Sequence, residues 1–112
     1  MQVKVIKDQK IEKHPGCVAE ALSIVGNKWT ALLVMELAKG TTRFSHLEIS
    51  LKGISPRTLS QRLDYLVDKS IITRQDFSEM PPRVEYLLTK KGYDLIPILQ
   101  SMASWGSKYY QD

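Results

Sequence analysis

The chain has 112 residues, 43% of them apolar and 25% charged, which is enough for one folded domain with a single core and too little for two. Its net charge of +4 and isoelectric point of about 9.2 are compatible with a polyanionic partner but do not identify one. A single cysteine excludes a disulfide framework within the chain, and no apolar run suits a signal peptide or a membrane span, so we expect a cytoplasmic protein.

The N-terminal part is predicted to hold an arm and a short helix. We expect residues 1–15 to form the arm and residues 16–112 to form the domain. The Pro15-Gly16 pair breaks the chain, and helical spacing of apolar residues then predicts a helix from Cys17 to Val25.

Two helices are predicted next, over Lys28–Lys39 and about Arg43–Ser50. Asn27 is placed to cap the first, Gly40 stands where its left-handed C-terminal residue is wanted, and Thr42 is a candidate cap for the second. Their apolar positions are Trp29, Leu32, Leu33 and Leu37 in the first and Phe44, Leu47 and Leu51 in the second.

The strongest helix signal begins at Ser55. Ser55 is a good N-cap, Pro56 suits the first helical position, and Ile54 is spaced to pack on Leu59 as a hydrophobic staple. Leu59, Leu63 and Leu66 then form one apolar stripe, which must be docked on the rest of the domain.

The exposed side of this helix carries hydrogen-bonding and basic side chains in its first turns. They are Arg57, Thr58, Gln61 and Arg62, and their donors and acceptors suit base edges and phosphates. With the preceding helix and the turn at Gly53, the pattern predicts a helix-turn-helix. An ordinary amphipathic surface helix with a solvated polar face is the alternative.

A β-hairpin and a long helix are predicted to complete the domain. Two strands, Ile72–Asp76 and Arg83–Leu88, flank a loop that ends in Pro81-Pro82. Thr89 caps a final helix over about Lys90–Tyr110, which Pro97 should bend or delay. We therefore predict an α+β, mostly helical fold: a winged helix-turn-helix with a two-stranded β-hairpin wing and a long C-terminal dimerisation helix.

Three blocks, in order over about residues 16–106, carry a family resemblance. They are Cys17 with Gly26-Asn27-Lys28-Trp29; Arg43-Phe44, Leu47 and Gly53-Ile54-Ser55 through Leu59, Arg62 and Leu63; and Pro81-Pro82-Arg83-Val84-Glu85-Tyr86 with Leu88-Thr89, Gly92 and Trp105. Together they resemble the HxlR-type winged-helix transcription regulators of bacteria and archaea, a MarR-like class. The chain departs from that pattern at Val18, where the family often has a proline after its cysteine.

The resemblance implies a homodimer that binds double-stranded operator DNA and represses or activates nearby genes. Its two reading helices would lie about 34–36 Å apart, so the operator should be an inverted repeat. The first and last helices would build the dimer interface, for which the candidates are Leu22, Leu99, Met102, Trp105 and Tyr109.

Two sets of side chains are candidates for contact with DNA. The reading helix supplies Ser55, Arg57, Thr58, Gln61 and Arg62, and cations of flanking elements that could hold phosphates are Lys28, Arg43, Arg74 and Arg83. A solvated surface charge is the alternative for each flanking cation. As a group they predict a steep salt dependence of binding.

Cys17 is a candidate redox or electrophile sensor, because the helix N-terminus favours a thiolate and some family members use a cysteine there. A small buried apolar residue is the alternative. With one cysteine per chain, a sensor requires S-thiolation, alkylation or a Cys17–Cys17 bond across the dimer.

Other chemistry has little support in the sequence. His14 and His46 lack the paired spacing of a zinc site, and no orienting group or oxyanion motif accompanies Cys17, so we expect neither a cofactor nor an enzyme. Two alternatives remain open: a winged-helix module that mainly binds a protein, and a regulator that takes a small effector between the helix-turn-helix and the dimer helices.

Overall fold

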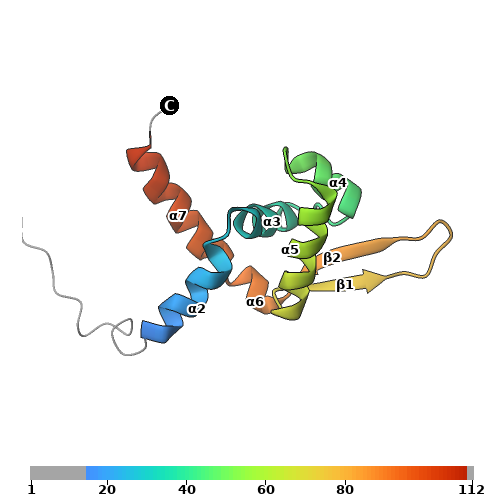
Figure 1. The fold of residues 1–112 in the computed structure, drawn as a ribbon, viewed down its shortest axis with the longest axis horizontal. Helices are drawn as coiled ribbons and strands as arrows, with labels where there is room; N and C mark the ends of the chain where they lie inside the picture. The colour runs from blue at the N-terminus through green and yellow to red at the C-terminus, as the bar shows by residue number, and fades with distance from the viewer. Residues whose placement is uncertain (1–14, 111–112) are drawn as a thin grey trace, which may run out of the picture.

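The computed structural model describes residues 15–110; the predicted N-terminal arm, with His14, lies outside this range. In chain order the elements are α2 (Pro15–Val25), α3 (Lys28–Ala38), α4 (Phe44–Ser50), α5 (Pro56–Asp68), β1 (Ile72–Asp76), β2 (Val84–Leu88), α6 (Lys90–Tyr93) and α7 (Ile96–Tyr109) (Figure 1). This order is the predicted winged helix-turn-helix, with β1 and β2 as the wing.

The signals at the start of α5 act as predicted. The Ser55 hydroxyl accepts a hydrogen bond from the backbone N–H of Thr58 at 3.0 Å, and Pro56 opens the helix. Its three stripe leucines, Leu59, Leu63 and Leu66, are completely buried. The turn from α4 passes through Gly53 at φ +91°, a backbone conformation that glycine adopts without strain.

Helix α3 runs through the centre of the molecule and is capped as expected. The Asn27 side chain accepts from the backbone N–H groups of Trp29 and Thr30, at 2.9 and 3.1 Å. The apolar positions predicted for this helix coincide only in part with its buried residues, which are Thr30, Leu33, Val34 and Leu37. That stripe follows the helical period and leaves Leu32 at its edge, 37% exposed.

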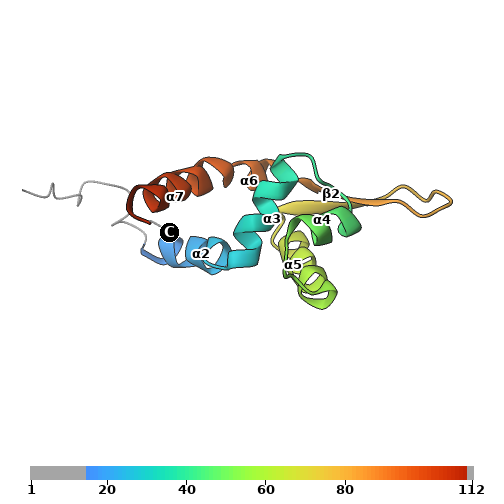
Figure 2. The ribbon, with the colours of Figure 1, turned by 90° about the horizontal axis from the view of Figure 1, so that it is seen from above.

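The segment before α4 forms a hydrogen bond with strand β2 and does not cap the helix through a side chain. Arg43 occupies the N-cap position without a side-chain cap bond, so the predicted cap at Thr42 is wrong. The Thr42 carbonyl accepts from the Tyr86 N–H of β2 at 2.9 Å. Strands β1 and β2 pair antiparallel, with Ile72 opposite Leu88. The hairpin projects away from the helices (Figure 2).

The predicted final helix is broken in two. Helix α6 ends at Tyr93 and α7 begins at Ile96, so the prediction of one helix over Lys90–Tyr110 is wrong in extent. The break lies where Pro97 has no N–H to donate to the carbonyl of Tyr93 and its ring would crowd that group. The interruption expected at Pro97 is thus confirmed.

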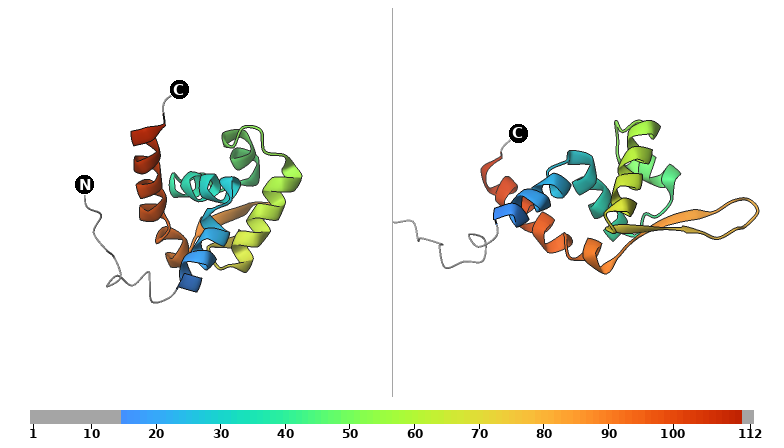
Figure 3. Two further views of the ribbon diagram at one scale, coloured as in Figure 1. Left: turned by 60° about the vertical axis from the view of Figure 1, so that its left-hand side comes forward. Right: turned by 60° about the horizontal axis from the view of Figure 1, so that its bottom comes forward.

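Helix α6 is anchored on the turn that joins α5 to β1. The Thr89 hydroxyl lies 2.6 Å from the carbonyl oxygen of Ser70 and 3.0 Å from that of Ile71, and it accepts from the Gly92 N–H at 3.1 Å. From this anchor α7 leads away from the wing. Helices α2 and α7 lie on the opposite side of the molecule from the hairpin (Figures 1 and 3).

Candidate nucleic-acid interface

The outward face of α5 is polar and accessible. Arg57 and Gln61 are exposed, whereas Thr58 and Arg62 are half-buried. Ser55, at the helix start, is exposed and also donates its hydroxyl to the Thr58 hydroxyl oxygen at 2.9 Å. The structure therefore brings all five predicted reading residues to the N-terminal half of one helix, whose free N–H groups favour anions.

Arg62 is held in place by a neighbour that sequence reasoning did not single out. Its guanidinium lies 4.8 Å from the centre of the Tyr65 ring, an i, i+3 contact on α5. The Tyr65 hydroxyl donates to the Ser23 carbonyl of α2 at 3.3 Å. Lys69 adds a 4.0 Å ion pair with Glu20 of α2. The reading helix is thus joined directly to α2.

Three of the predicted phosphate-binding cations are exposed and come from separate elements. Lys28 opens α3, with its ammonium 4.8 Å from the Trp29 ring centre; Arg43 precedes α4; Arg74 lies on β1. None of these three forms an ion pair among the described residues. Their charges are therefore available to a phosphate backbone.

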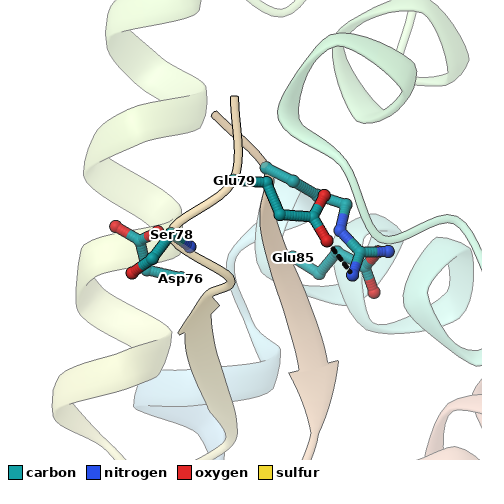
Figure 4. Close-up of polar contacts among 5 residues, drawn as sticks. Asp76, Ser78, Glu79 and Glu85 are labelled. Carbon is teal, nitrogen blue, oxygen red and sulfur yellow. Dashed lines mark hydrogen bonds and ion pairs between the residues drawn. The ribbon is translucent and has the colours of Figure 1, made fainter. Parts of the chain in front are cut away.

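Arg83 is different, because carboxylates already surround it. It pairs with Glu79 at 3.1 Å and with Glu85 at 3.4 Å (Figure 4). Its guanidinium carbon lies 3.8 Å from the centre of the Phe77 ring. These three partners of Arg83 were not predicted from the sequence. The i, i+2 spacing of Arg83 and Glu85 in a predicted strand was the available signal, since such residues share a face.

Helices α2 and α7 each expose apolar side chains. Trp105 and Tyr109 are 69% and 65% exposed, with ring centres 5.3 Å apart, and Leu22 and Met102 are about half exposed. Leu99, predicted for the dimer interface, is only 4% exposed and packs in the core of its own chain. We call the exposed set Leu22, Met102, Trp105 and Tyr109 the α2/α7 face.

Cys17 lies in the first turn of α2 and is exposed. In the single chain it is therefore not the small buried core residue that was the alternative interpretation. An exposed thiol at a helix N-terminus is accessible to reagents.

A groove between α3 and α7 is one candidate for the expected effector site. Its volume is about 210 Å³, and its lining is Met35, Ala38, Lys39, Ile96, Leu99 and Gln100. This is smaller than the roughly 300–1,000 Å³ typical of ligand pockets. The groove therefore does not support a drug-sized effector.

Within residues 15–110 no three His, Cys, Asp or Glu side chains gather in a way that could hold a metal ion. In the same range no single helix is long and apolar enough to cross a membrane, although Gly16–Val25 and Lys28–Ala38 meet the length and composition test as a pair bent by 73°.

Comparisons with known proteins agree on one class. Residues 24–112 match the model of the HxlR-like helix-turn-helix family. An HTH-type transcriptional regulator of Methanothermobacter thermautotrophicus is 39% identical over 92 residues, which cover 82% of this chain and 70% of that protein.

Two solved structures are similar over most of the chain. One, described as a transcriptional regulator of the MarR family from Enterococcus faecalis, is 39% identical with a TM-score of 0.77, and the match covers 85% of this chain and 86% of that one. The other is the redox regulator HypR in its oxidized form, 32% identical with a TM-score of 0.78, covering 85% of this chain and 98% of that one.

Proposed function

This chain belongs to the HxlR-like helix-turn-helix family of transcriptional regulators, and from that premise we propose that it binds operator DNA as a homodimer. In each protomer the N-terminal half of α5 enters the major groove. The single observation that carries the proposal is the exposed polar face of α5, where Arg57 and Gln61 are free on a helix whose opposite side is fully buried. The function needs no catalysis and no cofactor, and its place is the cytoplasm, with the DNA.

Phosphate contacts surround α5 in this proposal. Lys28, Arg43 and Arg74 lie on three different elements and neutralise phosphates on the strands that flank the groove. Such contacts fix the register of the protein on DNA but carry no sequence information. Base reading is left to Arg57, Gln61 and their neighbours on α5.

The α2/α7 face pairs with the same face of a second copy. An exposed aromatic pair such as Trp105 and Tyr109 is typical of protein interfaces, where tryptophan and tyrosine are enriched. Helices α2 and α7 lie on the opposite side of the molecule from the wing (Figure 3), so a dimer formed through them keeps the wing clear of the partner. A two-fold dimer places its α5 helices on the two halves of an inverted repeat.

Arg57→Ala is expected to weaken binding to a selected specific duplex at least about 30-fold, because one bidentate arginine–guanine contact contributes ~1–3 kcal/mol and the dimer loses one such contact in each of its two half-sites. Binding to a scrambled duplex should fall much less. Fluorescence anisotropy at near-physiological salt measures both affinities.

Lys90→Ala is the matched control, since it removes an equal charge from α6, where Lys90 is exposed and, within residues 15–110, pairs only with Asp94. It should leave the ratio of specific to non-specific affinity unchanged. Equal losses on both duplexes with Arg57→Ala would assign Arg57 to a phosphate instead of a base.

We extend the proposal to control through Cys17. Its thiol is exposed in the first turn of α2, and the other end of α2 contacts α5 through the Ser23 carbonyl and the Tyr65 hydroxyl. A modification at Cys17 therefore acts on the helix that joins the dimer face to the reading helix. The similarity to the redox regulator HypR supports this assignment.

Incubation with oxidised glutathione tests the Cys17 proposal. The Cys17 thiolate attacks the disulfide, forms a mixed disulfide and releases one glutathione thiolate. We expect mass spectrometry to show one glutathionyl group per chain and operator affinity to change by about fivefold or more, the lower end of typical couplings. Cys17→Ser should abolish both effects; a modified protein with unchanged affinity would contradict the sensor role.

A further inference from the structure

We propose that Arg83 is a positioning residue that sets the shape of the wing loop between β1 and β2, and that it does not bind a phosphate. The proposal rests on the DNA-binding function proposed above and assigns a different role to one cation of the wing. It is carried by the contacts of the Arg83 guanidinium with Phe77, Glu79 and Glu85.

The guanidinium is engaged on three sides. One terminal nitrogen lies 3.1 Å from Glu79 Oε2, the other lies 3.4 Å from Glu85 Oε2, and the Phe77 ring centre is 3.8 Å from the guanidinium carbon. The flat, forked guanidinium suits this combination of stacking and paired hydrogen bonds, and the round lysine ammonium does not. Arg83 Nε is buried and has no acceptor among the described residues. The two ion pairs with Glu79 and Glu85 must therefore offset the desolvation cost of this nitrogen.

These contacts connect the two ends of the loop to its middle. Phe77 follows β1, Glu79 lies within the loop, and Glu85 belongs to β2. The Phe77 N–H also donates to the Arg83 carbonyl at 2.9 Å, which extends the strand pairing by one step. Without the Arg83 side chain, Glu79 loses its one ion pair among the described residues, and the loop loses its ion pair with Glu85 of β2.

A second local bond completes the loop on the side of β1. The Asp76 carboxylate accepts from the Ser78 N–H at 2.9 Å, and Ser78 has φ +53° (Figure 4). The loop thus has a defined course before any DNA arrives. A wing loop that is already ordered in the free protein loses less conformational entropy when it binds DNA.

The charges around Arg83 argue against a phosphate contact. One positive charge stands against the two negative charges of Glu79 and Glu85, so the cluster as a whole repels a phosphate. Arg74, exposed on β1 and without an ion pair among the described residues, is the wing cation that is free to take one.

The test compares Arg83→Ala and Arg83→Lys with Arg74→Ala as the matched control. In the free protein, amide hydrogen exchange of residues 77–80 and 83 should speed up about tenfold or more in both Arg83 variants and stay unchanged in Arg74→Ala. On a selected duplex, both Arg83 variants should bind about fivefold more weakly, because each must order its wing on binding. Lysine should therefore fail to rescue.

A phosphate-binding Arg83 gives a different result. Arg83→Lys would then bind like the wild type, and Arg83→Ala would lower the slope of log affinity against log salt by about 0.9 for each chain. Either result overturns the proposal, as does unchanged exchange of the loop in both variants.

The double variant Glu79→Gln, Glu85→Gln separates positioning from net charge. Removing two negative charges should tighten DNA binding if charge alone matters, whereas loss of the preset loop should loosen the wing and weaken binding about fivefold. Tighter binding would overturn the proposal. The exchange measurement uses free protein, so it tests the positioning role of Arg83 independently of DNA. If the protein bound no DNA at all, that result would refute only the DNA-binding function proposed above.

Discussion

Trp105→Glu is expected to dissociate the homodimer and to abolish tight binding to an inverted-repeat operator. Trp105 is the most exposed member of the α2/α7 face, and its ring packs on Tyr109. Loss of one buried interface aromatic costs about 2–4 kcal/mol, and a two-fold dimer loses it twice. The dimer dissociation constant should therefore rise at least about a thousandfold, since each 1.4 kcal/mol is a factor of about ten. Sedimentation equilibrium measures it directly.

The isolated chain should tolerate this substitution, because Trp105 is 69% exposed and outside the core. Far-UV circular dichroism should show unchanged helix content. Tyr93→Glu, which places the same charge on an exposed aromatic position of α6, should leave the dimer intact. Equal dissociation constants for wild type and Trp105→Glu would contradict the proposed interface.

Gly92→Ala is expected to lower the free energy of unfolding by about 2–3 kcal/mol, as over-packing of a well-filled site typically does. A Cβ at this position would lie 2.3 Å from the carbonyl oxygen of Ile71 and 2.9 Å from Leu88 Cδ2. The Ile71 carbonyl is backbone and also accepts the Thr89 N–H at 3.0 Å, so relief of the clash must pull α6 away from the α5–β1 turn. Urea denaturation at a fixed protein concentration measures the change.

Gly16→Ala is the control, because a Cβ there meets nothing within 4 Å and Gly16 lies in the first turn of α2. The better helix propensity of alanine should leave the free energy of unfolding unchanged or raise it by up to about 1 kcal/mol. If Gly92→Ala unfolded at the same urea concentration as the wild type, the close packing of α6 on the α5–β1 turn would be wrong.

Elements fixed by local signals could be predicted from the sequence, and α5 is the clearest case. Its cap at Ser55, its first residue Pro56 and its leucine stripe all act within a few residues of each other. Strand β1 was predicted with the bounds that the structure has, and β2 begins at Val84, one residue later than expected. Such features need no knowledge of the tertiary fold.

Features that depend on distant parts of the chain could not be predicted in this way. The sequence pattern makes Thr42 a candidate cap for α4. In the structure the Thr42 carbonyl accepts from the Tyr86 N–H of β2, and the helix begins one residue later, after Arg43. Leu99 lies on an apolar helix face, and the sequence pattern does not distinguish burial in the chain's own core from burial against a partner. The ion pair of Arg83 with Glu79 spans only four residues, but it depends on the course of the loop, which no regular helix or strand spacing predicts.

The central claim, specific DNA binding by paired α5 helices, is tested most directly by selecting bound duplexes from a random pool with purified protein at near-physiological salt. We predict enrichment of an inverted repeat with half-site centres about one helical turn, 34–36 Å, apart. Enrichment should disappear with Arg57→Ala and persist with Lys90→Ala. Tight, salt-sensitive retention without any enriched sequence, or no retention at all, would contradict the account.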